Sequence, residues 1–249
     1  MYDVTGNVSR DIAGVKELII ADMRGKDMEL PISTGGPGAG LVGLDHLANL
    51  DLDIDFGTDK LSIFSPDHCE GQVVYWTNPA SVGIVPMQVG RDFHIRVPVT
   101  LDGHAERAII DTGATYTTFD VREEERVFNL DLGAPNTPER GDLNGDPSLK
   151  TYAHRFQTLS FGDVTVRNPE IFIIPHAEGR KADRSVLVGD RTKSEKDRVT
   201  VPDMIIGMNV LRKLHIYLAF KEQKMYVSPA SAPEAVPSGT QSVGAQPSQ

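Results

Sequence analysis

The residues best suited to chemistry are a carboxylate, a hydroxyl and a glycine at the end of a short apolar run. Residues 108–110 predict a buried strand, and Asp111, Thr112 and Gly113 follow it directly. A buried carboxylate costs on the order of several kcal/mol unless hydrogen bonds or a useful pKa shift compensate. Gly113 allows a tight turn that points Asp111 into a cleft, and Thr112 can tie the loop to a second copy of itself. The alternative interpretation of Asp111 is an ordinary acid in a strand-end turn.

A second motif lies further along the chain. Ile205-Ile206-Gly207 forms an apolar-apolar-Gly turn, residues 208–211 predict a short helix, and residues 215–227 predict a strand pair. Together with Asp-Thr-Gly at 111–113, and with flap-sized sequence between them, these motifs resemble the retropepsin-like and pepsin-like aspartic proteases. The resemblance covers about residues 95–228. It implies an all-β fold of pepsin/retropepsin-like acid protease lobes, one complete and one partial, of the bacterial tandem-lobe type.

The resemblance also implies a mechanism. Two aspartates share one proton: the ionised one activates a water that attacks the scissile carbonyl, and the protonated one polarises that carbonyl. Asp111 would be one member of this pair, and neither a metal nor another cofactor is needed. The residues that the resemblance assigns to the active-site loop are Thr112, Gly113, Ala114 and Thr115, and those that support the loop are Ile205, Ile206 and Gly207.

The flap that covers the substrate in such proteases is expected within residues 133–150, which are rich in Gly, Pro, Asn and Asp. Asn144, Gly145 and Asp146 are the candidate flap tip and substrate-binding residues, because Asn-Gly favours a tight hairpin turn. Residues 140–143 and 148–152 would form its arms. An ordinary surface loop is the alternative interpretation.

An internal repeat sets the domain organisation. A shift of 164 residues aligns residues 40–64 with residues 204–228. The identical pairs are Gly43/Gly207, Leu47/Leu211, Leu50/Leu214, Phe56/Phe220 and Lys60/Lys224. We therefore expect a partial first lobe over 1–65, a connector over 66–85, a complete lobe over 86–229 and a disordered tail over 230–249. Earlier in the chain, residues 18–32 have the same strand-turn-strand pattern as residues 159–174. Because Leu159 lies 48 residues after Asp111 and Leu18 is its counterpart, the counterpart of Asp111 falls about thirty residues before Met1.

Other segments carry further expectations. Residues 18–32 predict two strands around a Gly25 turn, residues 73–76 a connecting strand, and residues 158–174 two strands around Gly162-Asp163. The Asp102-Gly103 pair predicts a hairpin turn, and residues 121–130 predict a short helix whose run of three glutamates faces water. Asp51, Asp53 and Asp55 alternate with apolar residues, which predicts a solvent-facing row on one strand. Residues 176–200 predict a mobile insertion.

Composition bounds the partners. A net charge of −10 argues against nucleic acid, and no apolar run approaches the roughly 20 residues of a membrane span. The single cysteine, Cys69, excludes an intrachain disulfide, and the histidine spacing predicts no metal site. The expected partner is a polypeptide substrate. The compartment stays open: exported or periplasmic in a bacterium if an upstream signal exists, otherwise cytoplasmic.

The source of the second aspartate has three possible answers. A homodimer could bring Asp111 from two chains together, or an upstream segment could complete the first lobe. Alternatively the pair never forms, and the protein is a catalytically inactive peptide-binding or adaptor module with the protease fold.

Overall fold

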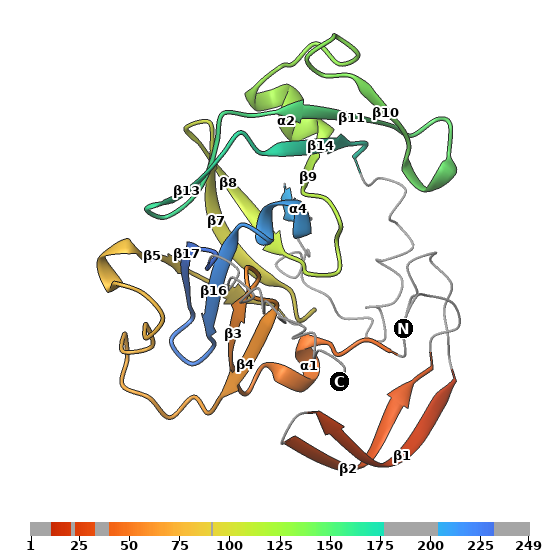
Figure 1. Cartoon of the computed structure of the whole chain (residues 1–249). Helices are drawn as coiled ribbons and strands as arrows, with labels where there is room; N and C mark the ends of the chain where they lie inside the picture. The colour runs from red at the N-terminus through yellow and green to blue at the C-terminus, as the bar shows by residue number, and fades with distance from the viewer. Residues whose placement is uncertain (1–10, 21–22, 33–39, 91, 177–203, 232–249) are drawn as a thin grey trace, which may run out of the picture.

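The structure is a computed structural model, and the residues that it describes are 11–20, 23–32, 40–90, 92–176 and 204–231. Over these residues the fold is all-β, with three sheets and a few short helices (Figure 1). The insertion expected at 176–200 and the tail expected at 230–249 lie almost entirely outside the described residues. In the described part of the chain, no helix is long and apolar enough to cross a membrane.

The largest sheet has ten strands in the order β10-β11-β14-β9-β15-β8-β7-β12-β13, with β6 also paired to β7. Its strands are β6 (Gln88–Val89), β7 (Ile95–Leu101), β8 (His104–Ile110), β9 (Thr118–Asp120), β10 (Glu139–Asp142), β11 (Lys150–Arg155), β12 (Thr158–Phe161), β13 (Val164–Arg167), β14 (Glu170–Ile174) and β15 (Met204–Ile206). Alternate residues of β7 point into the core, as the period of two in the sequence predicts. The turn between β7 and β8 is at Asp102 and Gly103, which both have positive φ, so this hairpin prediction is confirmed.

The centre of this sheet has an unusual connection. Strand β15 pairs in parallel with β8 on one side and antiparallel with β9 on the other. The chain therefore leaves β8, passes over the end of β15 and returns as β9. Residues 111–117 form this crossing, which places the candidate loop at the end of a buried strand. Ile206 of β15 is fully buried, and burial of such a side chain contributes roughly 2 kcal/mol.

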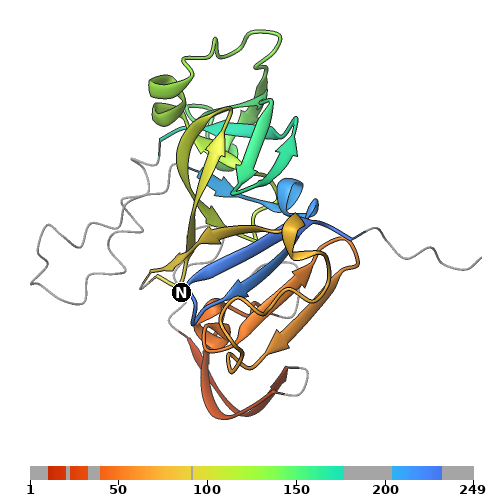
Figure 2. The same ribbon diagram turned by 90° about the vertical axis from the view of Figure 1, so that its left-hand side faces the viewer.

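The second sheet has five strands in the order β4-β3-β16-β17-β5. Its strands are β3 (Asp51–Asp55), β4 (Lys60–Phe64), β5 (Gly83–Pro86), β16 (Leu214–Ala219) and β17 (Lys224–Pro229). Strands β3 and β4 belong to one copy of the repeat, and β16 and β17 to the other. Figure 2 shows the orange strands beside the blue ones.

The pairing of β3 with β16 is symmetric under the repeat. Asp53 pairs with Tyr217, its own counterpart at the 164-residue shift. Leu52 pairs with Leu218 and Ile54 with Ile216, and the shift exchanges these two pairs. The two copies thus meet about a local twofold relation.

The third sheet is a two-stranded hairpin of β1 (Ile12–Ile20) and β2 (Met23–Pro31). The predicted turn at Gly25 is wrong, because Gly25 lies inside β2 and pairs with Leu18. The hairpin lies at the edge of the molecule in both views (Figures 1 and 2), and alternate side chains along β1 are exposed.

The helices are short. They are α1 (Leu44–Leu47), α2 (Val121–Val127) and α4 (Met208–Leu211), with 3-10 turns η1 (Pro79–Ser81) and η2 (Leu143–Gly145). Helices α1 and α4 occupy equivalent positions in the repeat. The predicted solvent-facing glutamate run on α2 is wrong for Glu124, which is buried and accepts a hydrogen bond from the Leu130 N–H at 2.6 Å. Burial raises the pKa of Glu124.

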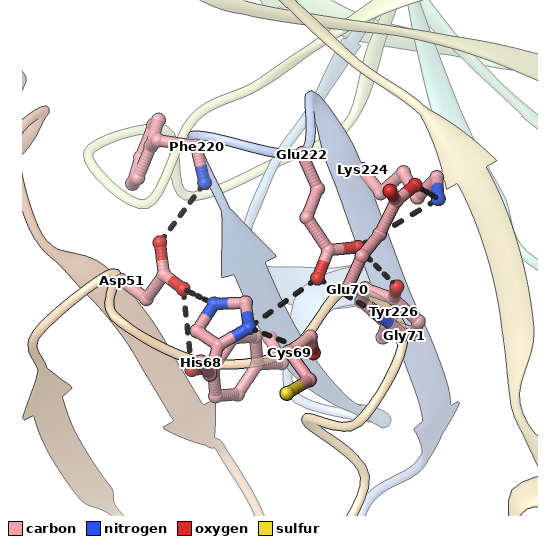
Figure 3. A network of polar contacts seen from close by, with 10 residues as sticks. Asp51, His68, Cys69, Glu70, Gly71, Phe220, Glu222, Lys224 and Tyr226 are labelled. Atoms are coloured by element: carbon pink, nitrogen blue, oxygen red, sulfur yellow. Dashed lines mark hydrogen bonds and ion pairs between the residues drawn. The ribbon is translucent and has the colours of Figure 1, made fainter.

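The aspartates of β3 do not face water, contrary to the sequence-based expectation. Asp51, Asp53 and Asp55 are all buried. Residues of the connector cover Asp51 and Asp53, and Asp55 accepts hydrogen bonds from Gly57, Thr58 and Ser231. Asp51 accepts hydrogen bonds from His68 Nε2 at 2.5 Å and from the Phe220 N–H at 3.1 Å. Figure 3 shows the His68 ring between Asp51 and Glu222. The alternation of polar and apolar residues correctly predicted the strand. It wrongly predicted that the aspartates on its polar face are exposed to solvent.

The connector itself differs from the prediction at residues 73–76, which have no strand structure. They are held by side chains instead. Trp76 stacks on His215 with ring centroids 4.4 Å apart and donates a hydrogen bond from Nε1 to the Ser228 hydroxyl at 3.0 Å. The Tyr75 hydroxyl donates to Asp53. These contacts pack Trp76 against the five-stranded sheet.

The region 158–174 holds three strands where two were predicted. The turn at Gly162-Asp163 joins β12 to β13 as expected. A second turn at Asn168 and Pro169 then starts β14, which pairs with β9 and β11. The extra strand matters because it places β9 within the large sheet.

Candidate active site

Asp111 is the first residue after β8 and is partly buried. Its N–H donates to the Ile206 carbonyl at 3.0 Å, which extends the β8–β15 pairing by one residue. Its carboxylate oxygen Oδ1 accepts the Gly113 N–H at 2.8 Å, and its carbonyl accepts the Ala114 N–H at 3.3 Å. These bonds fold residues 111–114 into a tight turn that fixes the direction of the carboxylate.

The loop continues across the end of β15 and is bonded to helix α4 beneath it. The Met208 N–H donates to the Ala114 carbonyl at 2.8 Å, and the Asn209 N–H donates to the Thr115 carbonyl at 3.1 Å. The loop therefore takes up two of the N–H groups that the first turn of a helix leaves without a partner inside that helix. Thr112 and Thr115 are exposed and Ala114 is partly buried, so one side of the loop is held and the other is open.

Gly207 makes the close approach possible. A Cβ at this position would lie 2.4 Å from the Tyr116 carbonyl oxygen and 2.8 Å from the Ala114 carbonyl oxygen. Both are backbone atoms that cannot move aside without moving the loop. Ile205 and Ile206 bring this glycine into place by pairing with Ile109 and Ile110 of β8. The structure thus brings the two sequence motifs into direct contact.

Two further residues position the loop, and the sequence analysis missed both. Thr117 is fully buried, and its hydroxyl accepts the Gly207 N–H at 3.1 Å. Asn209 accepts the Thr117 N–H at 2.7 Å and donates from Nδ2 to the Glu170 carbonyl at 2.8 Å. The sequence contained one usable signal for Asn209: the repeat places a short polar residue, Asp45, at the equivalent position.

The candidate flap has hairpin structure. Strands β10 and β11 pair antiparallel, and η2 closes the turn with Gly145 at positive φ. The turn is therefore a 3-10 turn rather than the simple two-residue turn expected from Asn144-Gly145. Ser148 donates to the Asp146 carboxylate from its N–H at 2.9 Å and its hydroxyl at 2.7 Å, which lowers the pKa of Asp146.

Ion pairs connect the two arms of this hairpin. Lys150 Nζ of β11 lies 2.8 Å from Asp142 and 3.0 Å from Glu139, both on β10. The two carboxylates raise the pKa of Lys150. The arms are exposed, so such pairs contribute little to stability, but they bias the register of the hairpin.

The loop crossing at residues 111–117 carries one acidic side chain, that of Asp111. One carboxylate can act as base or as acid but not as both at once. In the described residues, no group of three or more His, Cys, Asp or Glu side chains is arranged to hold a metal ion.

Comparison with known families gives one match over part of the chain. A family profile described as aspartyl protease matches residues 97–210, which include the loop of Asp111, the flap candidate and the Ile205-Ile206-Gly207 turn. No curated protein sequence matches this chain significantly.

Several solved structures are similar. A retropepsin-like aspartic protease from Rickettsia conorii is 13% identical, with 64% of this chain and 100% of that chain covered and a TM-score of 0.40. The retroviral protease-like domain of Ddi1 from Leishmania major is 15% identical, with 56% and 96% covered and a TM-score of 0.31. Conglutin gamma, a basic 7S globulin from lupine seeds, is 9% identical, with 84% and 64% covered and a TM-score of 0.44.

The profile match covers both motifs on which the loop is built, and the strands that carry them have the all-β arrangement described above. Over residues 97–210, the chain is therefore similar to the aspartyl protease family.

Proposed function

We propose that the protein is an aspartic endopeptidase in which Asp111 is one of two catalytic aspartates. The observation that carries the proposal is the position of Asp111 at the start of a loop that crosses the end of β15 and is bonded to it at Ile206. One carboxylate of the pair is ionised and removes a proton from water as that water attacks the scissile carbonyl. The other carboxylate is protonated and donates to the carbonyl oxygen.

The roles of the remaining residues follow from the same geometry. The Gly113 N–H holds Asp111 Oδ1, so the carboxylate keeps its direction while protons move. Gly207 and Ile206 fix the backbone below it. The substrate polypeptide binds extended, with main-chain hydrogen bonds to the hairpin of β10 and β11, and residues 144–146 form the tip that closes over it.

The second carboxylate comes from a polypeptide segment ahead of residue 1 or from a second chain. The five-stranded sheet supports the first source. Strand β3 pairs with β16 about a local twofold relation centred on Asp53 and Tyr217. A second copy of the chain that used the same twofold axis would have to displace β3 and β4. The chain therefore already contains part of its own partner lobe.

Substitution of the aspartate tests the proposal. The polypeptide that includes the segment before residue 1 is assayed for cleavage of an unfolded protein substrate, with product peptides identified by mass spectrometry. Asp111→Asn removes the ionisable group at nearly constant volume, and we expect cleavage to fall about 10³-fold or more. Asp131→Asn, at an exposed acid of the same region, is the matched control and should leave the rate unchanged. Activity retained by Asp111→Asn would reject the proposal.

The same assay separates the alternatives. If residues 1–249 alone cleave the substrate at a rate that rises with the square of protein concentration, the second carboxylate comes from a homodimer. If the substrate binds but no form of the protein cleaves it, the protein is a peptide-binding or adaptor module.

A further inference from the structure

The two copies of the repeat have the same elements but are covered to different extents. Residues Ile205 and Ile206 of the second copy are partly and fully buried, because β15 lies between β8 and β9. Their counterparts in the first copy are Leu41 and Val42, which are 82% and 54% exposed. Within the described residues, no strand pairs with residues 40–43. Two large apolar side chains thus lie in water where the repeat places a buried strand.

The sheet between the copies shows the same difference. The outer edge of β17 is covered by β5, which pairs with it over residues 83–86. Its counterpart β4 is an edge strand in the described part of the structure. Two apolar side chains of β4 are exposed, Leu61 at 53% and Phe64 at 37%. An exposed apolar edge strand is a template for another strand.

A single segment covers both equivalent surfaces in the second copy. Residues 83–120 supply β5, which pairs with β17, and then β8 and β9, which enclose β15. A segment of the same construction would cover β4 with its first strand and Leu41-Val42 with its later strands. It would also bring an aspartate loop across the end of residues 40–42.

Another copy of this chain cannot provide that segment. Within the part of the chain that the structure describes, one segment has this construction, residues 83–120, and two sets of surfaces need one. The segment is already bound to β15 and β17 of its own chain. If two chains exchanged this segment, it would cover the surfaces of the first copy but leave those of the second copy uncovered. Self-association therefore always leaves one set of surfaces uncovered in each chain.

We propose that Leu41, Val42 and the free edge of β4 form a docking surface for a segment that precedes residue 1 in the same polypeptide. The segment is recognised as an edge-pairing strand followed by two apolar strands joined by an Asp-Thr/Ser-Gly loop. The inference rests on the proposed function for the role of that aspartate, but the docking itself depends only on the uncovered surfaces.

Hydrogen exchange tests the docking independently of catalysis. Backbone amides of residues 41–42 and 60–64 are compared in residues 1–249 and in the polypeptide that includes the preceding segment. We expect exchange in the longer form to be about 100-fold slower or more at these amides, and unchanged at 205–206. Leu41→Lys should remove the protection at 41–42 in the longer form. This substitution leaves residues 1–249 folded, because Leu41 is exposed there.

Val89→Lys is the matched control, since Val89 is an exposed apolar residue outside the surface and should leave the protection intact. Equal exchange in the two forms, or no segment before residue 1, would overturn the proposal. So would protection in residues 1–249 that appears only at high protein concentration, because it would identify a second copy as the occupant. Slower exchange without cleavage would support the docking surface and reject the catalytic proposal. Cleavage without slower exchange would support the catalytic proposal and reject the docking surface.

Discussion

Gly207 and Thr117 hold the loop of Asp111 from below. Gly207 leaves room for the carbonyl groups of Ala114 and Tyr116, and its N–H donates to the buried hydroxyl of Thr117. The loop position therefore depends on the absence of one side chain and on one hydrogen bond. Neither residue touches the carboxylate, so both are positioning residues.

Replacement of Gly207 by alanine should displace this loop. The new Cβ would lie 2.4 Å from the Tyr116 carbonyl oxygen, and overpacking against backbone costs about 1–3 kcal/mol. We expect the free energy of unfolding to fall by that amount and cleavage to fall with it. Urea unfolding and the peptide assay measure the two effects. Gly14→Ala is the control, because a Cβ there meets no atom within 4 Å, and an equal loss in both variants would contradict this account.

The sequence pointed to residues whose type is unusual for the apolar segment in which they lie. It did not point to residues whose type is common in such a segment. Asp111 and Gly207 were predictable because an acid and a glycine interrupt apolar runs. Thr117 was not predictable, because a threonine next to a strand is common. Only the fold brings its hydroxyl to the Gly207 N–H, since the two residues are 90 positions apart in the sequence. Asn209 could be identified only by comparing the two copies of the repeat.

At the level of elements, the connector over residues 66–82 is attached to the five-stranded sheet by titratable groups. His68 bonds to Asp51, Tyr75 to Asp53, and the Gly71 N–H to Glu222 at 3.0 Å. Burial lowers the pKa of His68, but the hydrogen bond and charge of Asp51 outweigh it, so the net pKa is raised. The attachment should therefore depend on pH.

His68→Ala should destabilise the protein more at pH 6 than at pH 9. A histidine whose folded pKa lies above its unfolded value of about 6.5 contributes its full stabilisation below pH 6.5. The contribution is lost as the pH rises through the folded pKa. We expect a difference of about 1 kcal/mol between the two pH values, measured by urea unfolding with the fluorescence of Trp76, the only tryptophan.

Asp51→Asn supplies the control for this prediction. Without the aspartate, the raised pKa of His68 loses its main cause, so His68→Ala made in the Asp51→Asn protein should show little dependence on pH. A pH effect of unchanged size in that background would show that another group is responsible.

Elements with a regular pattern were predictable, and those held by side chains were not. The alternation of β7, the Asp102-Gly103 turn and helix α4 follow from local sequence. The burial of Asp51 and Asp53 does not, because alternation cannot show that a connector without regular structure covers these side chains. Its contacts come from isolated residues such as His68 and Trp76.

At the scale of the whole molecule, the repeat explains both what is packed and what is open. It accounts for the symmetric register of β3 and β16, for the paired edge of β17 and for the exposed Leu41 and Val42. The second copy supports the loop of Asp111, and we propose that the first copy supports an equivalent aspartate loop. Under this proposal, a complete site needs a second loop bound to the first copy.

The most direct measurement of this claim is a double-mutant cycle on the two aspartates. Cleavage of one unfolded substrate is measured for the polypeptide that includes the preceding segment. The forms compared are the parent protein, Asp111→Asn, the equivalent substitution in the preceding segment, and both together. Because the two carboxylates act as one unit, each single substitution should remove nearly all activity and the double should be no worse. Independent, multiplying losses, or full activity in Asp111→Asn, would contradict the account.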